Sequence, residues 1–299
     1  MLRQPSFLKK GDTIGIVCTA RKISKEELQP AISLYESWGL QVQLGDTIGE
    51  EENQYGGTDK ARATDFQQMM TDKNIKAIIC ARGGYGTVRM MDYLDFTPFS
   101  QNPKWVVGFS DITVLHAHIN TYIGTQTLHA AMPSTIPTST EDTIDSLQSA
   151  LFGEKYSIEA PLHKFNRVGE AEGIVVGGNL SLLYAILGTK SGINTDDKIL
   201  FIEDLDEYLY HIDRMMIALK RAGKLNKLKA LVVGGMTDMN DNTIPFGKSA
   251  EEIIAEHVAE FDYPVCYGFP SGHGEDNRSL IFGKKCRLSV DVERVELQF

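Results

Sequence analysis

The 299-residue sequence has few cysteines, and none of them is spaced for a metal site or a redox motif. Its four cysteines, Cys18, Cys80, Cys266 and Cys286, lie far apart, and no CxxC or Cys/His pattern is present. Cys18 and Cys80 belong to apolar runs that predict buried strands, where a thiol behaves as a small hydrophobic group. We therefore expect inert core cysteines in a reducing compartment, and no metal site.

Long hydrophobic runs and clustered positive charges are also absent from the sequence. The N-terminal segment has no apolar core of signal-peptide length, and no later run approaches the length of a membrane span. With histidine neutral, 30 Lys and Arg against 40 Asp and Glu give a formal net charge of -10. This charge provides no attraction to nucleic acid or to an anionic membrane. We expect a cytoplasmic protein with neither of these partners.

What the sequence does contain is the composition of an ordinary globular protein, with 42% hydrophobic and 23% charged residues. Its length suits one large domain or two of moderate size, and it can bury a core without disulfides or metals. In the first half, short apolar strands alternate with helical stretches, one of which begins after Ser24 and stops before Gly39. This alternation predicts an α/β fold with a mostly parallel sheet covered on both faces.

The strand and helix pattern loosens between about Pro133 and Gly169. This stretch is first rich in Pro, Ser and Thr and then lacks helical periodicity, which predicts a linker with extended pieces. Strand and helix patterns return in the second half, beginning near VVGGNLSLL. We therefore expect an N-terminal α/β domain over residues 1–150, a linker over 151–172 and a C-terminal α/β domain over 173–299.

The segment VVGFSDIT carries the sharpest local signal for chemistry. An apolar strand ends there, and Ser110 stands at the turn into a helix, which is the arrangement of a nucleophile elbow. The start of the helix offers free N–H groups and a positive dipole end to a developing oxyanion. The match to GxSxG is incomplete because Ile112 replaces the second glycine. The alternative is that Ser110 or Asp111 only caps the helix.

A second candidate segment, RGGYG, runs from Arg82 to Gly86 directly after an apolar strand. Its glycines allow backbone N–H groups to approach a ligand closely. The spacing fits neither GxGxxG nor a Gly-Lys-Ser/Thr phosphate loop, so a nucleotide site has weak support. In a hydrolase, the N–H of Gly84 or of its neighbour would complete an oxyanion hole with the N–H of Asp111. A plain glycine-rich turn is the alternative.

A serine nucleophile requires a base and an acidic partner. Of the seven histidines, His273 lies between two glycines in a loop, which favours presentation of its ring, although a solvated loop histidine remains the alternative. His129 follows a strand-like run, where we expect it to line the cleft. Glu203 and Asp204 end an apolar strand, the position at which open α/β sheets build their sites.

Six segments together resemble the blocks of the LD-carboxypeptidases, in the same order and at similar spacing. They are YGGTDKAR, RGGYG, GFSDIT, VVGGNLSLL, LFIEDLDE and GHGEDNRSLIFG. The likeness extends from about Gly11 to Gly283, which is nearly the whole chain. One departure is the sequence His-Ala-Ala-Met-Pro after position 129, where many relatives have Gly-Pro after the histidine. This departure concerns the shape of the adjacent cleft wall.

The resemblance implies a catalytic triad of Ser110, Glu203 and His273, with Asp111 and the RGGYG loop as backbone oxyanion donors. It also implies a two-domain fold with the active site in the interdomain cleft, usually in a homodimer. The implied reaction releases the terminal D-alanine from a murein tetrapeptide, a small peptide substrate, without a metal or organic cofactor. Arg82 is our candidate for binding the substrate carboxylate.

Two alternatives to this activity stay open at this point. The chain also resembles the microcin-immunity peptidases, which cut a peptidyl-nucleotide and should carry aromatic side chains that stack on a nucleobase. Trp38 and Trp105 have the pattern of core residues, which leaves Tyr85 as a possible stacking surface. The second alternative is a muropeptide-binding protein without turnover.

Overall fold

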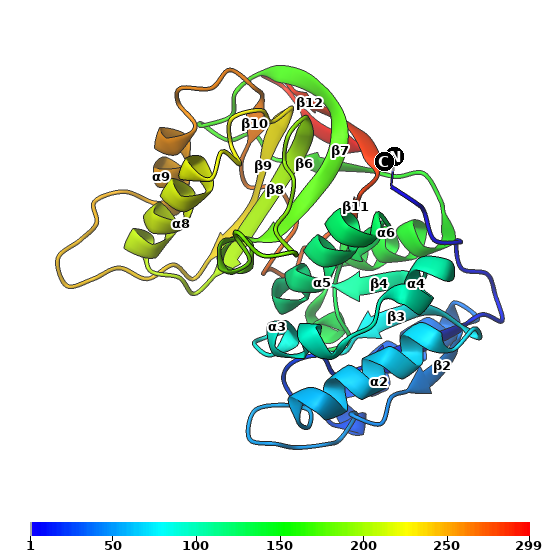
Figure 1. The fold of residues 1–299 in the computed structure, drawn as a ribbon. Coiled ribbons are helices and arrows are strands. Elements are labelled where there is room, and N and C mark those ends of the chain that lie inside the picture. The colour runs from blue at the N-terminus through cyan, green and yellow to red at the C-terminus, as the bar shows by residue number, and fades with distance from the viewer. Residues whose placement is uncertain (1) are drawn as a thin grey trace.

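A computed structural model describes residues 2–299, and within them the chain forms two β-sheets with separate sets of helices (Figure 1). The first sheet has the strand order β11-β5-β4-β3-β1-β2. Its strands are β1 Thr13–Val17, β2 Gln41–Leu44, β3 Ile75–Cys80, β4 Trp105–Gly108, β5 Thr127–His129 and β11 Leu280–Phe282. Strands β1 to β5 are parallel and β11 is antiparallel, so the mostly parallel α/β sheet predicted from the sequence is confirmed.

Helices cover both faces of this first sheet. They are α1 Lys25–Ser37, α2 Asp59–Thr71, α3 Thr87–Met90, α4 Thr97–Gln101, α5 Thr113–His118 and α6 Glu141–Phe152. Because side chains alternate along a strand, Ile14 and Ile16 of β1 pack with α1 and α6 on one face, whereas Val17 packs with α2 on the other. Burial on both faces explains why the inner strands β1, β3 and β4 are mostly apolar.

Helix α1 begins and ends where the sequence predicts. The Ser24 hydroxyl accepts a hydrogen bond from the Glu27 N–H, and the Glu27 carboxylate accepts one from the Ser24 N–H, which completes a capping box. After the helix, Gly39 adopts a φ of 84°, a left-handed conformation that glycine takes without strain. Local capping signals therefore define this helix at both ends.

Strands β6 to β10, β12 and β13 form the second sheet, in the order β10-β9-β8-β7-β12-β13-β6. They are β6 Ser157–Ala160, β7 Gly169–Asn179, β8 Lys198–Leu205, β9 Ala230–Thr237, β10 Val265–Cys266, β12 Lys285–Val290 and β13 Val295–Gln298. Strands β7 to β10 are parallel, whereas β12, β13 and β6 join in antiparallel fashion.

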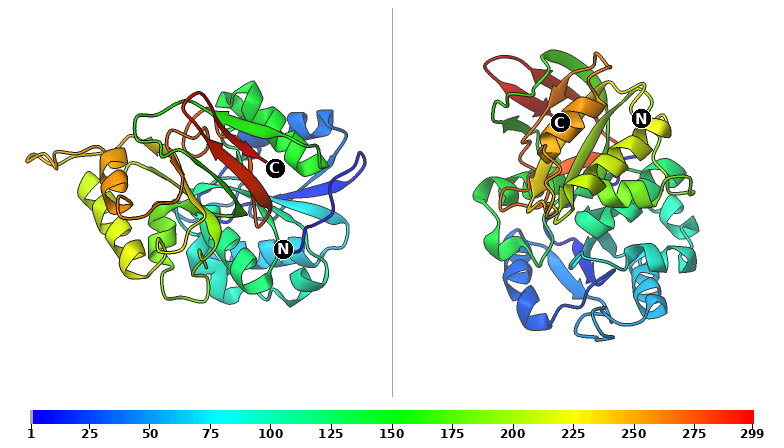
Figure 2. Two further views of the ribbon diagram at one scale, coloured as in Figure 1. Left: turned by 90° about the horizontal axis from the view of Figure 1, so that it is seen from above. Right: turned by 90° about the vertical axis from the view of Figure 1, so that its left-hand side faces the viewer.

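Helices pack against one face of this second sheet, namely α7 Leu180–Ala185, α8 Leu209–Arg221 and α9 Ala250–His257. The opposite face buries Phe201 of β8 against Phe282 and Leu288, which belong to the last third of the chain. Two further views show α8 (yellow) and α9 (orange) on the side away from the red C-terminal strands (Figure 2). The two faces therefore have separate hydrophobic cores.

The extended pieces expected in the linker at residues 151–172 belong to the second sheet, because they include β6 and the first residues of β7. In the first half, the segment MMDYLDF after α3 forms only a 3₁₀ turn at Met91–Tyr93. The reason is that the side chain of Gln67 binds both the N–H and the C=O of Asp95, which removes these groups from helical hydrogen bonding.

All four cysteines are buried and unpaired, as the sequence predicts. Burial raises the pKa of each thiol to about 12, so the reactive thiolate form is scarce at neutral pH. Within residues 2–299, no helix has both the length and the apolar character required to cross a bilayer.

Candidate active site

Ser110 lies at a sharp turn between β4 and α5. Gly108 ends the strand with a φ of 155°, and a Cβ placed there would lie 2.8 Å from Cγ1 of Ile112. Ser110 itself has a φ of 62°, a strained conformation for a residue with a side chain and one that recurs at functional sites. It opens a short 3₁₀ turn that has no side-chain cap. The hydroxyl is therefore available for another partner.

That partner is His273, whose Nε2 lies 3.0 Å from Oγ of Ser110. On the other side of the ring, Nδ1 lies 2.6 Å from Oε2 of Glu203. Glu203 is fully buried near the end of β8. Gly272, with a φ of 118°, permits this contact, because a Cβ there would lie 2.8 Å from the same carboxylate oxygen. The three side chains that the resemblance implies as a triad thus form one hydrogen-bonded chain.

The environment of His273 favours its protonated form. Burial by itself would lower the pKa of the ring, but the charge of Glu203 and its hydrogen bond outweigh this effect, and Asp204 adds to them. The net pKa of His273 therefore lies above the ordinary value of 6.5. A histidine with these properties accepts a proton readily and stays oriented by the carboxylate behind it.

The RGGYG loop lies beside Ser110. A Cβ on Gly83 would lie 3.2 Å from Cβ of Ser110, so the first glycine of the loop faces the serine most closely. In the described part of the chain, neither the N–H of Gly84 nor that of Asp111 donates a hydrogen bond to another residue. The Asp111 carboxylate accepts a hydrogen bond from the N–H of Thr87 at 2.7 Å. Asp111 therefore ties the elbow to the end of this loop and leaves its own N–H free.

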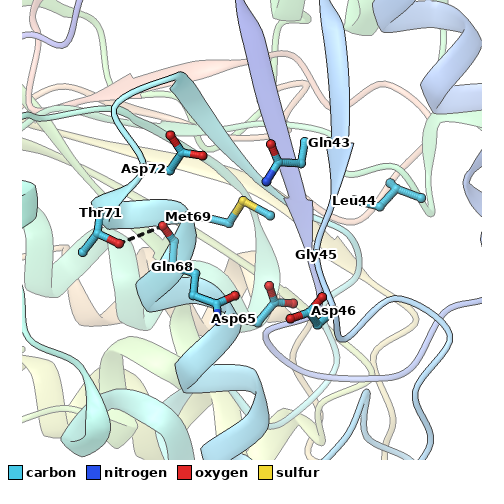
Figure 3. A pocket seen from close by; sticks show the side chains of 9 residues that line it. All are labelled: Gln43, Leu44, Gly45, Asp46, Asp65, Gln68, Met69, Thr71 and Asp72. Carbon is cyan, nitrogen blue, oxygen red and sulfur yellow. Dashed lines mark hydrogen bonds between the residues drawn. The ribbon is translucent and has the colours of Figure 1, made fainter.

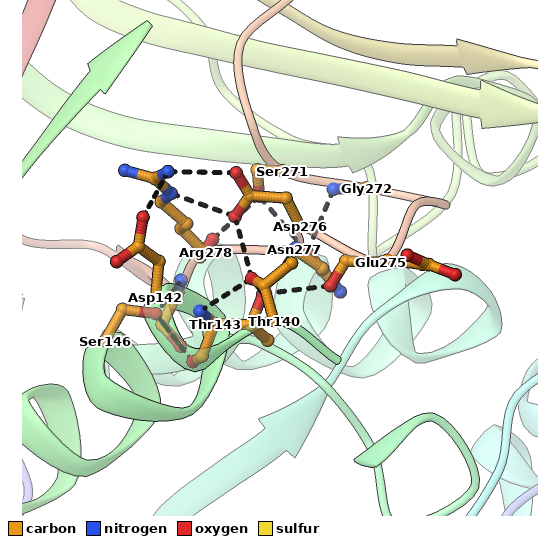
Figure 4. A network of polar contacts seen from close by, with 11 residues as sticks. Thr140, Asp142, Thr143, Ser146, Ser271, Gly272, Glu275, Asp276, Asn277 and Arg278 are labelled. Carbon is orange, nitrogen blue, oxygen red and sulfur yellow. Dashed lines mark hydrogen bonds and ion pairs between the residues drawn. The ribbon is translucent and has the colours of Figure 1, made fainter. Parts of the chain in front are cut away.

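A polar network holds the loop that carries His273 against the start of α6 (Figure 4). Oδ1 of Asn277 accepts a hydrogen bond from the N–H of Gly272 at 2.9 Å, next to the histidine. The N–H of Asn277 in turn donates to Oγ1 of Thr143 in α6 at 2.8 Å. Oγ1 of Thr237, at the end of β9, donates to the carbonyl of His273 at 2.6 Å. The histidine is thus positioned by elements of both halves of the chain.

The elbow helix α5 also contacts the end of β7. Gly178 allows this approach, because a Cβ there would lie 2.5 Å from Oγ1 of Thr113. The same hydroxyl accepts a hydrogen bond from the N–H of Asn179 at 3.0 Å. The Asn179 side chain then donates to the buried Asp204 at 2.8 Å, and Asn179 pairs in register with Glu203. A continuous set of contacts therefore connects the strand of Glu203 with the helix that follows Ser110.

An open cavity of about 780 Å³ surrounds Ser110 and His273. Its walls come from both halves of the chain and include Gly83 and Gly84 on one side and Asn179 on the other. The carboxyl ends of parallel strands β1, β3 and β4 in the first sheet, and of β7 and β8 in the second, lead into these walls. The cavity has the size of a site for a small molecule or short peptide.

Two residues expected to bind substrate do not line this cavity. His129 is fully buried and packs against Phe109, Phe201 and Phe282, because β11 pairs alongside it and closes that edge of the sheet. The expectation that His129 lines the cleft is therefore wrong. Tyr85 is 45% exposed and its ring lies 6.4 Å from that of Tyr55, outside the residues that form the cavity wall.

Arg82 does line the cavity, as does a second cation, Arg21, which sequence reasoning missed. Asn179 was missed as well, whereas Gly83 falls within the prediction of Gly84 or its neighbour. Arg21 and Asn179 both lie at or just after the carboxyl end of a parallel strand, which is the signal that would have pointed to them. No comparable signal separates Gly83 from Gly84 in the sequence, because their distances to Ser110 depend on the folded loop.

His116 lies beneath the elbow and is also fully buried. Its Nε2 donates to the carbonyl of Gly108 at 2.7 Å, whereas its Nδ1 has no partner among the described residues. Burial lowers the pKa of His116 to about 4. In the neighbouring His129, both ring nitrogens lack partners within residues 2–299, and burial lowers its pKa well below 6.5. Both rings are therefore neutral in the folded protein near pH 7.

We expect acid to destabilise the protein through His116. As the pH falls below 6.5, His116 becomes protonated in the unfolded chain, whereas in the folded protein it stays neutral until about pH 4. The free energy of unfolding therefore decreases between pH 6.5 and pH 4. For His116 alone the loss is roughly 2 kcal/mol by pH 5. Urea unfolding at pH 7.5 and pH 5 measures it. His116→Gln should lose less stability than the wild type over this range. Equal losses in the two proteins would contradict this account.

A second hollow, of about 250 Å³, lies between the end of β2 and α2, away from Ser110 (Figure 3). Asp46, Asp65 and Asp72 are among its lining residues. The buried Asp65 accepts hydrogen bonds from the N–H and hydroxyl of Thr47, at 2.9 and 2.5 Å. Across residues 2–299, no three His, Cys, Asp or Glu side chains are grouped so that they could hold a metal ion. The carboxylate of Asp65 thus has a structural role in the β2–α2 connection.

Comparison with known proteins assigns both halves of the chain. Residues 14–130 match the LD-carboxypeptidase N-terminal domain, and residues 172–288 match the LD-carboxypeptidase C-terminal domain. A probable murein peptide carboxypeptidase of Bacillus subtilis is 35% identical over 298 residues, covering 96% of this chain and 92% of that protein. The microcin C7 self-immunity protein of Escherichia coli is 26% identical over 331 residues, covering 97% of this chain and 94% of that protein.

Solved structures agree with these matches. The crystal structure of muramoyltetrapeptide carboxypeptidase from Oxalobacter formigenes is similar to this chain with a TM-score of 0.86 and 26% sequence identity. The match covers 96% of this chain and 98% of that one. The two domain matches and the 35% identity over nearly the full length point the same way. The chain belongs to the LD-carboxypeptidase family.

Proposed function

We propose that the chain is a serine carboxypeptidase that hydrolyses the L,D-peptide bond before the terminal D-alanine of murein tetrapeptides. The observation that carries the proposal is the chain of hydrogen bonds from Ser110 through His273 to Glu203 at the wall of an open cavity. The murein peptide carboxypeptidase names of its relatives support the substrate class. A homodimer and a cytoplasmic location remain predictions from the sequence.

The proposed reaction follows from the positions of these groups. His273 Nε2 takes the proton of the Ser110 hydroxyl while Oγ attacks the carbonyl carbon. The N–H groups of Asp111 and the RGGYG loop bind the resulting oxyanion. The C–N bond then breaks, and His273 returns the proton to the nitrogen of the departing D-alanine. Water attacks the acyl-enzyme with His273 again as base, which releases the tripeptide and restores Ser110.

The wall of the cavity favours a peptide over a nucleotide. A peptidyl-nucleotide hydrolase needs an aromatic surface on which a nucleobase can stack. Trp38 and Trp105 are both in the core, with 8% and 0% exposure, as the sequence predicts. Among the described residues that line the cavity, Phe109 is the only Phe, Tyr or Trp, and its exposure is 4%. A role in binding without turnover does not account for the Ser110–His273–Glu203 arrangement.

The test is hydrolysis of L-Ala-γ-D-Glu-meso-diaminopimelyl-D-Ala by the purified protein, followed by mass spectrometry of the products. We expect release of D-alanine and no release from the same peptide ending in L-alanine. An aminoacyl sulfamoyl-adenosine serves as the competing substrate, and we expect it to stay intact. Hydrolysis of this nucleotide conjugate in preference to the tetrapeptide would replace the proposal with the microcin-immunity type of activity. Tight binding of the tetrapeptide without cleavage would favour the binding-only role.

A further inference from the structure

A carboxypeptidase must recognise the free carboxylate at the end of its substrate, and two cations border the cavity. Arg82 is engaged elsewhere, since its guanidinium lies 3.6 Å from Oε1 of Glu27. The other oxygen of Glu27 belongs to the capping box of α1. Arg82 thus connects the RGGYG loop to α1. Arg21 also lines the cavity, and no carboxylate within residues 2–299 forms an ion pair with it.

The side chain of Arg21 lies across the RGGYG loop. A Cβ on Gly84 would lie 2.6 Å from Cδ and 2.7 Å from Nε of Arg21, so the glycine is required for this approach. The N–H of Arg21 also donates to the carbonyl of Gly83 at 3.4 Å. Gly83 is in turn the loop residue against Ser110, with its Cβ position 3.2 Å from that of the serine. The contacts of Arg21 and of Ser110 therefore fall on adjacent residues of the loop, one position apart.

This spacing matches the chemistry of the leaving group. The carboxylate of a terminal D-alanine lies one residue beyond the scissile carbonyl, which is about 3.8 Å along the chain. A guanidinium offers two parallel N–H donors to such a carboxylate. The other charged groups that line the cavity include Glu26, Asp206 and Glu207, which repel a carboxylate. Recognition of the carboxylate in this acidic surrounding therefore depends on a cation close to the Gly83–Gly84 pair.

We propose that Arg21 is the residue that binds the free C-terminal carboxylate of the substrate and so determines carboxypeptidase specificity. The proposal rests on the proposed function, and it replaces Arg82 in this role. Arg82 keeps a structural part, in which it joins the oxyanion loop to the first helix through Glu27. Arg21 acts on binding and orientation of the leaving group, and it takes no part in proton transfer.

The test compares the tetrapeptide with its C-terminal amide, in which the negative charge is removed and the scissile bond is kept. We expect the wild type to prefer the free acid. Arg21→Gln should lower kcat/KM for the acid by roughly 30- to 300-fold, mainly through KM, and should leave hydrolysis of the amide nearly unchanged. Arg21→Lys should recover part of the preference for the acid. Arg82→Gln is the matched control and should retain the wild-type ratio of acid to amide.

A loss of the acid-to-amide preference in Arg82→Gln, or its persistence in Arg21→Gln, would overturn the assignment. A binding measurement separates this result from failure of the proposed reaction. Calorimetry with Ser110→Ala, which retains the cavity, should show tighter binding of the acid than of the amide. Addition of Arg21→Gln should remove this difference even if the wild type turns out to cleave neither peptide. Equal binding of acid and amide by Ser110→Ala would also refute the role of Arg21.

Discussion

Replacement of Ser110 by alanine should lower the rate of D-alanine release by roughly 10⁴- to 10⁶-fold. The substitution removes the Ser110 hydroxyl, whose oxygen lies 3.0 Å from Nε2 of His273 and would give this nitrogen its proton. Alanine keeps the Cβ and tolerates the φ of 62° no worse than serine does. The oxyanion donors and the cavity stay in place, so substrate binding should persist. Release of D-alanine under single-turnover conditions, followed by mass spectrometry, measures the effect.

Ser134→Ala is the matched control for this experiment. Ser134 lines the same cavity, but its hydroxyl has no histidine partner among the described residues. We expect this variant to retain activity within about tenfold of the wild type, which is small beside the loss expected on removing a catalytic group. If Ser110→Ala retained comparable activity, Ser110 would not be the nucleophile. If Ser134→Ala lost activity as completely, the loss would reflect the cavity as a whole.

Replacement of Glu203 by glutamine should cost about 10⁴-fold in kcat, the magnitude found when the acid of a serine triad becomes an amide. The amide can place its NH₂ group against Nδ1 of His273, which turns that nitrogen into an acceptor and leaves the proton on Nε2. In that tautomer, Nε2 cannot accept the proton of Ser110 from its distance of 3.0 Å. The buried position of Glu203 means that water cannot substitute for the lost carboxylate.

The pH dependence of kcat/KM distinguishes this effect from simple misfolding. In the wild type, His273 must be neutral to act as a base, so activity should rise with pH through a pKa above 6.5. In Glu203→Gln, burial still lowers the pKa of the ring, while the attraction to the charge of Glu203 is gone. The rise of the residual activity with pH should therefore begin at a lower pH than in the wild type. If the rise stays at the same pH, a group other than His273 controls it.

The turn at Ser110 and the proximity of Ser110, His273 and Glu203 could largely be predicted from the sequence, because each depends on local pattern or on blocks along the chain. Local sequence pattern is not sufficient to choose between the two candidate acids. Glu203 and Asp204 are neighbours on β8, and side chains of neighbouring strand residues point in opposite directions. The carboxylate of Glu203 consequently reaches His273, whereas that of Asp204 binds the Asn179 side chain. Without the resemblance, the sequence alone does not distinguish the two.

Features that depend on pairing of distant segments could not be read from the sequence. His129 looked like a residue of the cleft because it ends a strand, but it is covered by β11, which comes from residues near the C-terminus. Arg21 follows the carboxyl end of β1, a signal present in the sequence, but its packing over Gly84 depends on the folded RGGYG loop. Strand β7 was partly taken for a linker, because its first residues alternate between exposed and buried positions and include charged Glu170 and Glu172.

The return of β11 to the first sheet bears on how the protein is made. A ribosome delivers the N-terminal segments first, and domains begin to fold as they emerge. The edge of β5 has no partner until Leu280–Phe282 arrives, when almost the whole chain has been synthesised. The loop with His273 directly precedes this strand, so the histidine reaches Ser110 in the same late step. A chain that stops before the His273 loop lacks the contact between His273 and Ser110, so we expect it to cleave no peptide.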